Sequence, residues 1–505
     1  MTQRNQKSQG NQRSQRTQNS PVKLLSGVHE GPGSHGMLRV SAGIRGVHTI
    51  LRAMPEEWYL PALLATKGES SGTEPAPVSL SPLHRGPRPE GSRAPGDTRS
   101  DITSAVRRNP RAEAFVFARS ETALLSGEKP PKFELPEDEE TGWSPRLVTC
   151  PWETARMREH EAADLVLEEL VRAYARPLKR SESPSVNIFG PPMFGPNARA
   201  EMDEAARLLE KIGVEVNARL PLGAGVEDLK RLPRAWANLV LYREVGDSAT
   251  LYLRDEFGIP RVTTPMIGAA GTGSVLRSVG SLCSLDPRQV QRATFSELSQ
   301  TARLPWYARL ASPETFAGRR VAIFGDFTYA VGLGYVLARE VGLEIAPCGT
   351  YMEHLRQDFL FQASSFTDEA FATDDPEEAA ARIEGARPDL VIGTHLEEKV
   401  AESLGVPFLP LVPPTAHESL VEQPLMGYAG SSILADHLRG ALRKVPRDTV
   451  QGEDGPGVPW TEGALEELEN ISPFLRGRAR RMAEERARER GSAEVTRRIL
   501  RESRS

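Results

Sequence analysis

Short apolar runs alternate with stretches of helical periodicity along most of this chain, and this alternation limits the folds open to it. The apolar runs predict strands at 112–118, 185–190, 214–220, 237–242, 259–264, 319–326, 343–350, 389–394 and 406–412. Apolar residues at helical spacing predict helices at 159–174, 198–212, 248–257, 329–341, 376–384 and 397–404. Strands and helices that alternate so densely form parallel sheets covered by helices on both faces. The predicted fold class is therefore α/β.

The length of the chain sets the expected number of domains. A chain of 505 residues is too long for one hydrophobic core, so about three domains are expected. The predicted α/β domains are 36–178, 184–312 and 318–445, with a linker at 446–458 and a helical segment at 459–505. Pro, Gly and Ser between about 67 and 100 predict a flexible loop inside the first domain. Thr461 is the expected N-cap of a helix over 462–469.

Both ends of the chain are rich in arginine. Residues 1–30 hold basic, Gln and Ser residues with little to bury, which predicts a disordered basic tail. Residues 476–505 contain eleven Arg and five Glu. That composition is typical of a solvated helix with local ion pairs. A basic arm that docks on an acidic partner or covers an anionic substrate is the alternative.

The bulk composition excludes several classes of protein. Hydrophobic residues make up 39% of the chain and charged residues 26%, with a net charge of only -5. These values indicate a globular protein without a bias toward nucleic acid or membrane surfaces. The sequence has no run of about 18 apolar residues and no apolar segment typical of a secretory signal. We therefore expect a cytoplasmic protein that is not an integral membrane protein.

The cysteines restrict the metal chemistry of the chain. Cys150, Cys283 and Cys348 lie far apart and form neither a disulfide framework nor a CxxC pair. Four thiolates are the usual ligands of an iron–sulfur cluster. This chain cannot supply them alone, so any such cluster must be shared with another chain.

Three loops that follow predicted strands are the candidate ligand sites. They cover residues 190–197, 325–334 and 393–398, where ligands of α/β sheets usually bind. None matches a dinucleotide or ATP motif, so each is either an anion site or a tight turn. His417 is the histidine best placed for a site, although an exposed loop position is the alternative. The residues alone indicate a multi-domain α/β ligand-binding protein.

Several longer segments carry a family resemblance. GVEDLKRLPRAWANLVLYREVGDSATLYLRDEFGIPRVTTPMIG and VAIFGDFTYAVGLGYVLAREVGLEIAPCGTY resemble parts of the second and third domains of one family. WTEGALEELENISPFLRGRARRMAEERARERG is similar to that family's small C-terminal domain, and EGPGSHGMLRVSAGIRGVHTIL is like its N-terminal strand and helix. The chain thus resembles the B subunits of light-independent protochlorophyllide reductases, a branch of the nitrogenase-like reductases.

That resemblance implies both a fold and an activity. The implied fold has three Rossmann-like parallel-sheet domains of the nitrogenase MoFe-protein type and a small helical C-terminal domain. The implied partners are an N-type subunit, in a heterotetramer, and a separate iron protein that hydrolyses ATP. Electrons pass through a [4Fe–4S] cluster shared between the N and B subunits. In this ferredoxin-linked reaction they reduce the C17–C18 double bond of protochlorophyllide in (bacterio)chlorophyll synthesis in the dark.

The resemblance also points to candidate site residues. The family's cluster ligand is an Asp, and the matching stretch PEEWY places Glu57 there. A solvated turn is the alternative for Glu57. The family's Cys in an SCT context corresponds to Glu121, near the cluster. The family's proton-donating acid corresponds to Ser312, and its pocket His corresponds to Ala416, with His417 beside it.

These departures leave two alternatives to a divergent B subunit of the reductase. A serine hydroxyl does not supply a proton at neutral pH as a carboxylic acid does. The first alternative is therefore a non-catalytic paralogue that binds a tetrapyrrole or assists assembly. The second alternative is a reductase that acts on another tetrapyrrole.

Overall fold

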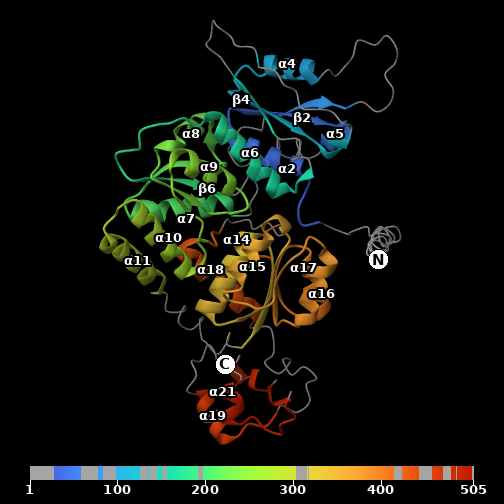
Figure 1. Cartoon of the computed structure of the whole chain (residues 1–505), viewed down its shortest axis with the longest axis vertical. Helices are drawn as coiled ribbons and strands as arrows, with labels where there is room; N and C mark the ends of the chain where they lie inside the picture. The colour runs from blue at the N-terminus through green and yellow to red at the C-terminus, as the bar shows by residue number, and fades with distance from the viewer. Residues whose placement is uncertain are drawn as a thin grey trace, which may run out of the picture.

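A computed structural model describes most of the chain. The described residues are 28–58, 78–83, 98–125, 135, 145–150, 156–190, 197–302, 316, 318–413, 423–442, 458–469 and, with single-residue gaps, 479–502. Ser312, Ala416 and His417 lie outside the described residues, as does the predicted tail up to residue 27. Figure 1 shows three sheet units stacked along the molecule, with the C-terminal helices at the bottom.

Sheet I is made of four parallel strands in the order β3-β2-β4-β5. They are β2 (Val47–Ala53), β3 (Val78–Pro82), β4 (Ala114–Arg119) and β5 (Arg146–Thr149). Every residue of the two central strands, β2 and β4, is buried. Val116 of β4 belongs to the core with helices α2 (Gly33–Gly43) and α6 (Glu159–Tyr174). Phe115 and Phe117 belong to the core with α4 (Thr98–Arg108), as expected when successive side chains point to opposite faces.

The prediction of a flexible loop between about residues 67 and 100 is wrong in part. β3 lies within that range and pairs with β2 from Thr49↔Val78 to Ala53↔Pro82. Proline cannot donate a backbone hydrogen bond, and for this reason a Pro-rich sequence predicts irregular structure. β3 is an edge strand, however, and among the residues that the structure describes it pairs with β2 alone. An edge strand tolerates Pro82 because only one side must carry the ladder.

Sheet II repeats the parallel arrangement in the order β10-β9-β6-β7. Its strands are β6 (Ser185–Phe189), β7 (Glu215–Leu220), β9 (Ala237–Val240) and β10 (Arg261–Val262). The helices that connect or cover them include α7 (Ala198–Lys211), α9 (Asp247–Phe257), α10 (Gly268–Leu282) and α11 (Pro287–Ala302). A two-stranded parallel pair joins sheets I and II, since β1 (Ile44–Arg45) pairs with β8 (Ala224–Gly225).

Sheet III has five parallel strands in the order β13-β12-β11-β14-β15. They are β11 (Arg320–Gly325), β12 (Glu344–Thr350), β13 (Ala370–Ala372), β14 (Leu390–Ile392) and β15 (Phe408–Leu409). The unit's helices are α14 (Phe327–Val336), α15 (Arg356–Ala363), α16 (Pro376–Ala386) and α17 (Glu397–Leu404), while α18 (Gly427–Leu442) returns to pack on α10 and α11. The predicted α/β class with parallel sheets is confirmed. The domain boundaries given above stay a proposal.

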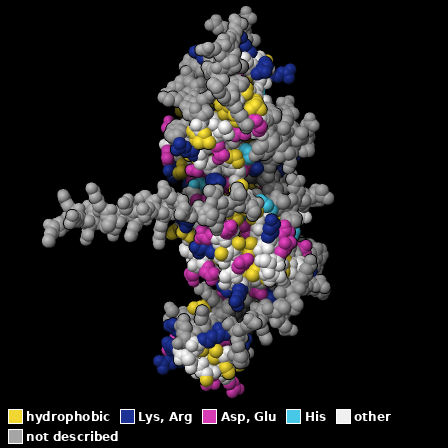
Figure 2. Space-filling model, turned by 90° about the vertical axis from the view of Figure 1, so that its right-hand side faces the viewer, with side chains coloured by type: hydrophobic (Ala, Val, Ile, Leu, Met, Phe, Trp, Pro, Cys, Tyr) yellow, Lys and Arg dark blue, Asp and Glu magenta, His cyan; other side chains and the backbone are white. Residues whose placement is uncertain are grey.

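The C-terminal segment has a hydrophobic core of its own. Helices α19 (Glu462–Glu469) and α21 (Arg497–Glu502) pack around Leu468, Ala483, Ala487, Val495 and Leu500. Arg497 pairs with Glu466, and Arg501 with Glu467, so local ion pairs join the two helices. The hydroxyl of Thr461 donates to the carbonyl of Val495 at 3.2 Å, and the backbone carbonyl of Thr461 accepts from the first helical turn. Figure 2 shows basic and acidic side chains interspersed on this lobe.

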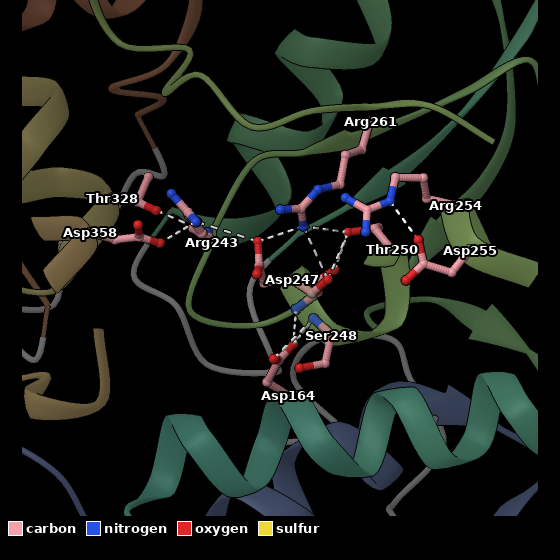
Figure 3. A network of polar contacts seen from close by, with 11 residues as sticks. Asp164, Arg243, Asp247, Ser248, Thr250, Arg254, Asp255, Arg261, Thr328 and Asp358 are labelled. Atoms are coloured by element: carbon pink, nitrogen blue, oxygen red, sulfur yellow. Dashed lines mark hydrogen bonds and ion pairs between the residues drawn. The ribbon is translucent and has the colours of Figure 1, made fainter. Parts of the chain in front are cut away.

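A polar network ties the three sheet units together (Figure 3). Asp164 on α6 accepts hydrogen bonds from the backbone nitrogens of Gly246, at 2.6 Å, and Ser248, at 3.1 Å, where α9 begins. Arg243, just after β9, forms an ion pair with Asp358 on α15. Its backbone nitrogen donates to the hydroxyl of Thr328 on α14 at 3.0 Å. Each sheet unit is therefore fixed to another by polar groups.

The first described residues insert between sheets I and III. The Nε2 atom of His29 lies 2.9 Å from Oε1 of Glu397, and its ring stacks on Tyr351 with centroids 5.2 Å apart. The Nδ1 atom of His160 lies 2.7 Å from Oε1 of Glu30. The predicted tail therefore ends before residue 30, because His29 and Glu30 are buried. The tail was predicted from local composition. Composition does not reveal contacts with distant residues, such as the stacking of His29 on Tyr351 or the pairing of Glu30 with His160.

Candidate functional site

The carboxyl edge of sheet I carries the two predicted residues that the structure describes. Glu57 lies in a short 3-10 helix, Pro55–Trp58, directly after β2. Glu121 begins the helix α5 (Glu121–Leu125), directly after β4. Because β2 and β4 are parallel neighbours, their carboxyl ends meet at one edge. The structure thus brings Glu57 and Glu121 to the same part of the sheet.

The carboxylate of Glu57 is held by three donors. Its Oε2 atom accepts a hydrogen bond from the backbone nitrogen of Met54 at 2.6 Å and from the hydroxyl of Ser120 at 2.9 Å. Its Oε1 atom accepts from the hydroxyl of Thr122 at 2.9 Å. Glu57 is half-buried. It is therefore not a freely solvated turn residue, since its side chain folds back on the end of the sheet.

Glu121 itself does not supply these contacts. Its side chain is exposed, while the residues on either side of it reach Glu57. Sequence reasoning selected Glu121 and missed Ser120 and Thr122. The available signal was their place directly after a predicted strand, where hydroxyl side chains often cap a helix. Ser120 does cap α5, because its hydroxyl accepts from the backbone nitrogen of Ala123 at 3.2 Å.

The donor set of the chain bears on the implied iron–sulfur cluster. Burial raises the pKa of Cys283 to about 11 and the pKa of Cys150 to about 12, and it raises the pKa of Cys348 further. All three cysteines are buried and free, so none is a thiolate at neutral pH. Within the described residues, no three His, Cys, Asp or Glu side chains come together as a metal site. The half-buried carboxylate of Glu57 is suited to be one ligand of a shared cluster. Among the described residues, this group of side chains provides no further ligand beside it.

A second group of buried acids lies where sheets II and III meet. Glu201 on α7 accepts from the hydroxyl of Tyr329 at 2.6 Å, and burial raises the pKa of Glu201 to about 8. Glu244 accepts from the hydroxyl of Thr328 at 2.6 Å. Burial and the charge of Glu244 raise the pKa of Asp326, which caps α14 through the backbone nitrogen of Tyr329 at 2.9 Å. Sequence reasoning marked the loop of Asp326 and missed these partners, which come from α7 and from the turn after β9.

His160 and Glu30 form a buried histidine–carboxylate pair at the junction of sheets I and III. Burial disfavours the charged form of Glu30, but the hydrogen bond and charge of His160 outweigh it and lower the pKa of Glu30. Burial likewise opposes protonation of His160, but Glu30 outweighs it and raises the pKa of His160. Each group thus favours the ionised form of the other. None of the described helices is long and apolar enough to cross a membrane.

Comparison with known families assigns most of the chain. Residues 134–443 match the family described as nitrogenase component 1 type oxidoreductase. Residues 460–504 match the family described as the proto-chlorophyllide reductase 57 kD subunit. A solved structure titled "Nitrogenase Cp1 at pH 6.5" is similar to this chain, with a TM-score of 0.64 and 16% identity. The similarity covers 85% of this chain and 97% of that one, and it confirms the nitrogenase-type fold.

Curated relatives point to the same family. The B subunit of light-independent protochlorophyllide reductase from Chlorobium phaeobacteroides is 30% identical over 94% of this chain and 98% of its own length. The protein of the same name from Halorhodospira halophila is 31% identical over 94% of this chain and 98% of its own. The one from Chloroflexus aggregans is 31% identical over 83% of this chain and 76% of its own. This chain therefore belongs to the nitrogenase component 1 type oxidoreductases and, within them, to the family of light-independent protochlorophyllide reductase B subunits.

Proposed function

We propose that this chain is the B subunit of an ATP-dependent, light-independent protochlorophyllide reductase in the cytoplasm. Its complex reduces the C17–C18 double bond of protochlorophyllide to give chlorophyllide. The observation that carries the proposal is the joint match of the nitrogenase-type body and the C-terminal segment at 460–504. The relatives named as B subunits span the same two parts over nearly their whole length.

Glu57 is the residue proposed to bind the cluster from this side. It presents a carboxylate at the carboxyl edge of sheet I, where parallel sheets place their ligands. An N-type partner subunit supplies the remaining ligands, because the three cysteines here are buried thiols. When bound, the [4Fe–4S] group supplies single-electron transfer to the substrate. A separate iron protein hydrolyses ATP and delivers the electrons, and two copies of each subunit form a heterotetramer.

A subunit that binds the tetrapyrrole without reducing it is the second candidate. Ser312 and Ala416 stand where the family has an acid and a histidine. A serine hydroxyl cannot replace a carboxylic acid as a proton donor near neutral pH. On this reading, the complex binds protochlorophyllide and the reaction stops before protonation. His417 and Glu121 then keep no catalytic part.

Reconstitution with an N-type subunit and an iron protein separates the two candidates. Purified components are mixed without oxygen and given ATP, a reductant and protochlorophyllide. Chlorophyllide is followed by its red absorbance band. Turnover supports the reductase. Pigment that co-elutes with the complex but is never reduced, in the presence of bound iron, supports the second candidate. A complex that retains neither iron nor pigment defeats both.

Two neighbouring acids provide a matched pair of variants for Glu57. Glu57→Gln removes the charge but keeps the shape of the side chain, so iron retention and turnover should both fall strongly. Glu56→Gln makes the same change one residue earlier, at an exposed position of the same 3-10 helix. Glu56→Gln should behave as the wild type. Equal iron content in all three complexes would remove Glu57 from the ligand set.

A further inference from the structure

We propose that Ser120 and Thr122 are positioning residues that select which oxygen of Glu57 faces the metal. The inference rests on the proposed function and deepens it, because it assigns roles to two residues on α5 and at its N-cap. The family pattern Ser-Cys-Thr reads Ser120-Glu121-Thr122 here. The middle residue has changed, but both hydroxyls remain, and both contact Glu57.

The proton of Ser120 has one direction available. Its backbone nitrogen donates to the carbonyl of Arg52 on β2 at 2.9 Å, which fixes the main chain at the end of the sheet. Its hydroxyl oxygen accepts from the nitrogen of Ala123 at 3.2 Å. A hydroxyl carries a single proton, so that proton is directed to Oε2 of Glu57, 2.9 Å away. Ser120 is only 3% exposed, so water does not compete for it.

The acceptor positions of Glu57 then determine the ligating oxygen. An ionised carboxylate has about four lone-pair positions, two on each oxygen. Both positions on Oε2 are taken, by Met54 and Ser120. On Oε1 the hydroxyl of Thr122 takes one position, and within the described residues the other is left open. A metal ion held by Glu57 would therefore use the open position on Oε1.

Thr122 has a different effect from Ser120. Its hydroxyl donates to Oε1, the same atom that is left to bind metal. A hydrogen bond to a ligand atom draws electron density from it and weakens its donation to the metal. Weaker donation favours the reduced form of a cluster, so the bond raises the reduction potential. Thr122 is exposed, which allows its hydroxyl to be removed without opening a core.

The longer side chain of Glu57 is consistent with this arrangement. The resemblance implies an Asp at this position, one methylene shorter. In this chain the extra methylene lets the carboxylate turn back to the nitrogen of Met54, three residues earlier, at 2.6 Å. The carboxylate is thereby held at the end of β2 and next to the end of β4. Ser120 and Thr122 hold it from the β4 side.

The test uses the anaerobic complex of the full chain with its N-type subunit. The variants are Thr122→Val, Thr122→Ser and Ser120→Ala, and Thr103→Val is the matched control. Thr103 lies on α4 and donates to the carbonyl of Arg99, away from Glu57. The readouts are iron per complex, the rate of iron loss to a chelator, the electron paramagnetic resonance spectrum and the midpoint potential. None of them requires turnover.

The two positions predict different changes. Thr122→Val should keep its iron and shift the midpoint potential to a more negative value, while Thr122→Ser should return it to the wild-type value. Ser120→Ala should lose iron to the chelator about tenfold faster or more, as expected when an outer-shell partner of a ligand is removed. Thr103→Val should match the wild type in every readout.

The wild-type complex distinguishes the two ways of failing. If it holds no iron with its N-type partner, the proposed function falls and the inference falls with it. If it holds iron, a Thr122→Val potential equal to that of Thr103→Val overturns the role of Thr122. A chelator rate in Ser120→Ala equal to the wild-type rate overturns the role of Ser120.

Discussion

The carboxylate of Asp164 on α6 lies 2.6 Å from the backbone nitrogen of Gly246, immediately before α9. This contact joins the helix that covers sheet I to the first turn of a helix of sheet II (Figure 3). A carboxylate at a helix N-terminus accepts orphan backbone N–H groups and is favoured by the helix dipole. Asp164 is nevertheless so deeply enclosed that burial raises its pKa to about 6.

Asp164 should make the stability of the chain depend on pH. Because its folded pKa, about 6, exceeds the ordinary value of 3.8, the native state holds an extra proton between those values. Stability from this group is complete below pH 3.8 and is lost as the pH rises through about 6. The loss is at most about 3 kcal/mol for about two pKa units.

The variant Asp164→Asn isolates this effect. It cannot ionise, so the difference between its urea midpoint and that of the wild type should increase from about pH 4.5 to about pH 7. The quantity to compare is the difference between variant and wild type at each pH, since other groups cancel in it. A difference that stays the same at both pH values would contradict the assignment.

Replacement of Arg243 by Met should loosen the contact between sheets II and III. Arg243 pairs with Asp358 on α15 and with Asp247, and its side chain is 15% exposed. Arg243→Met should lower the free energy of unfolding by about 1–3 kcal/mol, because two carboxylates lose a partly buried partner. Arg254→Met removes an exposed pair with Asp255 and should leave the free energy of unfolding nearly unchanged. The free energies of unfolding are measured by urea titration. Equal values for the two variants would show that the pair between Arg243 and Asp358 does not stabilise the fold.

Glu201 should tolerate Gln but not Ala at neutral pH. With a pKa of about 8 the side chain is protonated at pH 7, so Gln has nearly its shape and charge. Glu201→Gln should cost less than about 1 kcal/mol, whereas Glu201→Ala leaves the hydroxyl of Tyr329 without this acceptor and should cost about 2–4 kcal/mol. The raised pKa means that wild-type stability falls as the pH rises from 4.5 through about 8. Thermal unfolding at pH 9 should therefore favour Glu201→Gln over the wild type.

Two helical glycines should respond in opposite ways to alanine. A Cβ at Gly36 on α2 would lie 1.8 Å from the carbonyl oxygen of Glu159, at the start of α6. Gly36→Ala must push the two helices apart and should cost about 3 kcal/mol. A Cβ at Gly385 on α16 would meet nothing within 4 Å, and Gly385→Ala should stabilise by about 0.5–1 kcal/mol. Melting temperatures that move in the same direction for both would contradict the close packing.

The elements that the sequence predicts well are those with a strong local pattern. The structure has helices at Glu159–Tyr174 and Glu397–Leu404, the bounds expected from the periodicity of their apolar residues. The helix predicted at 376–384 begins at Pro376, where Asp375 caps it by accepting from the nitrogen of Glu377. Each of these features depends on residues within one or two turns, so local physics is sufficient to predict them.

The features that escaped prediction depend on tertiary packing. α10 is rich in Gly, Ser and Thr, which are weak helix formers, yet it is enclosed by α11, α14 and α18. β3 was missed because its proline, Pro82, is acceptable only at an edge. Glu57 was found through the resemblance, but its partners Ser120 and Thr122 are 63 and 65 residues away. Only the adjacency of β2 and β4 reveals them.

The contact between His29 and Glu397 bears on the order in which the chain acquires its native form during synthesis. The two residues are 368 positions apart, and Glu397 begins α17, a helix of the last sheet unit to be synthesised. The β1–β8 pair also forms late, because Ile44 pairs with Ala224, which is synthesised much later. His29 therefore reaches its final place only after Glu397 has been translated. Proteins shortened from the C-terminus should leave residues 28–31 open to protease, even where sheet I has formed.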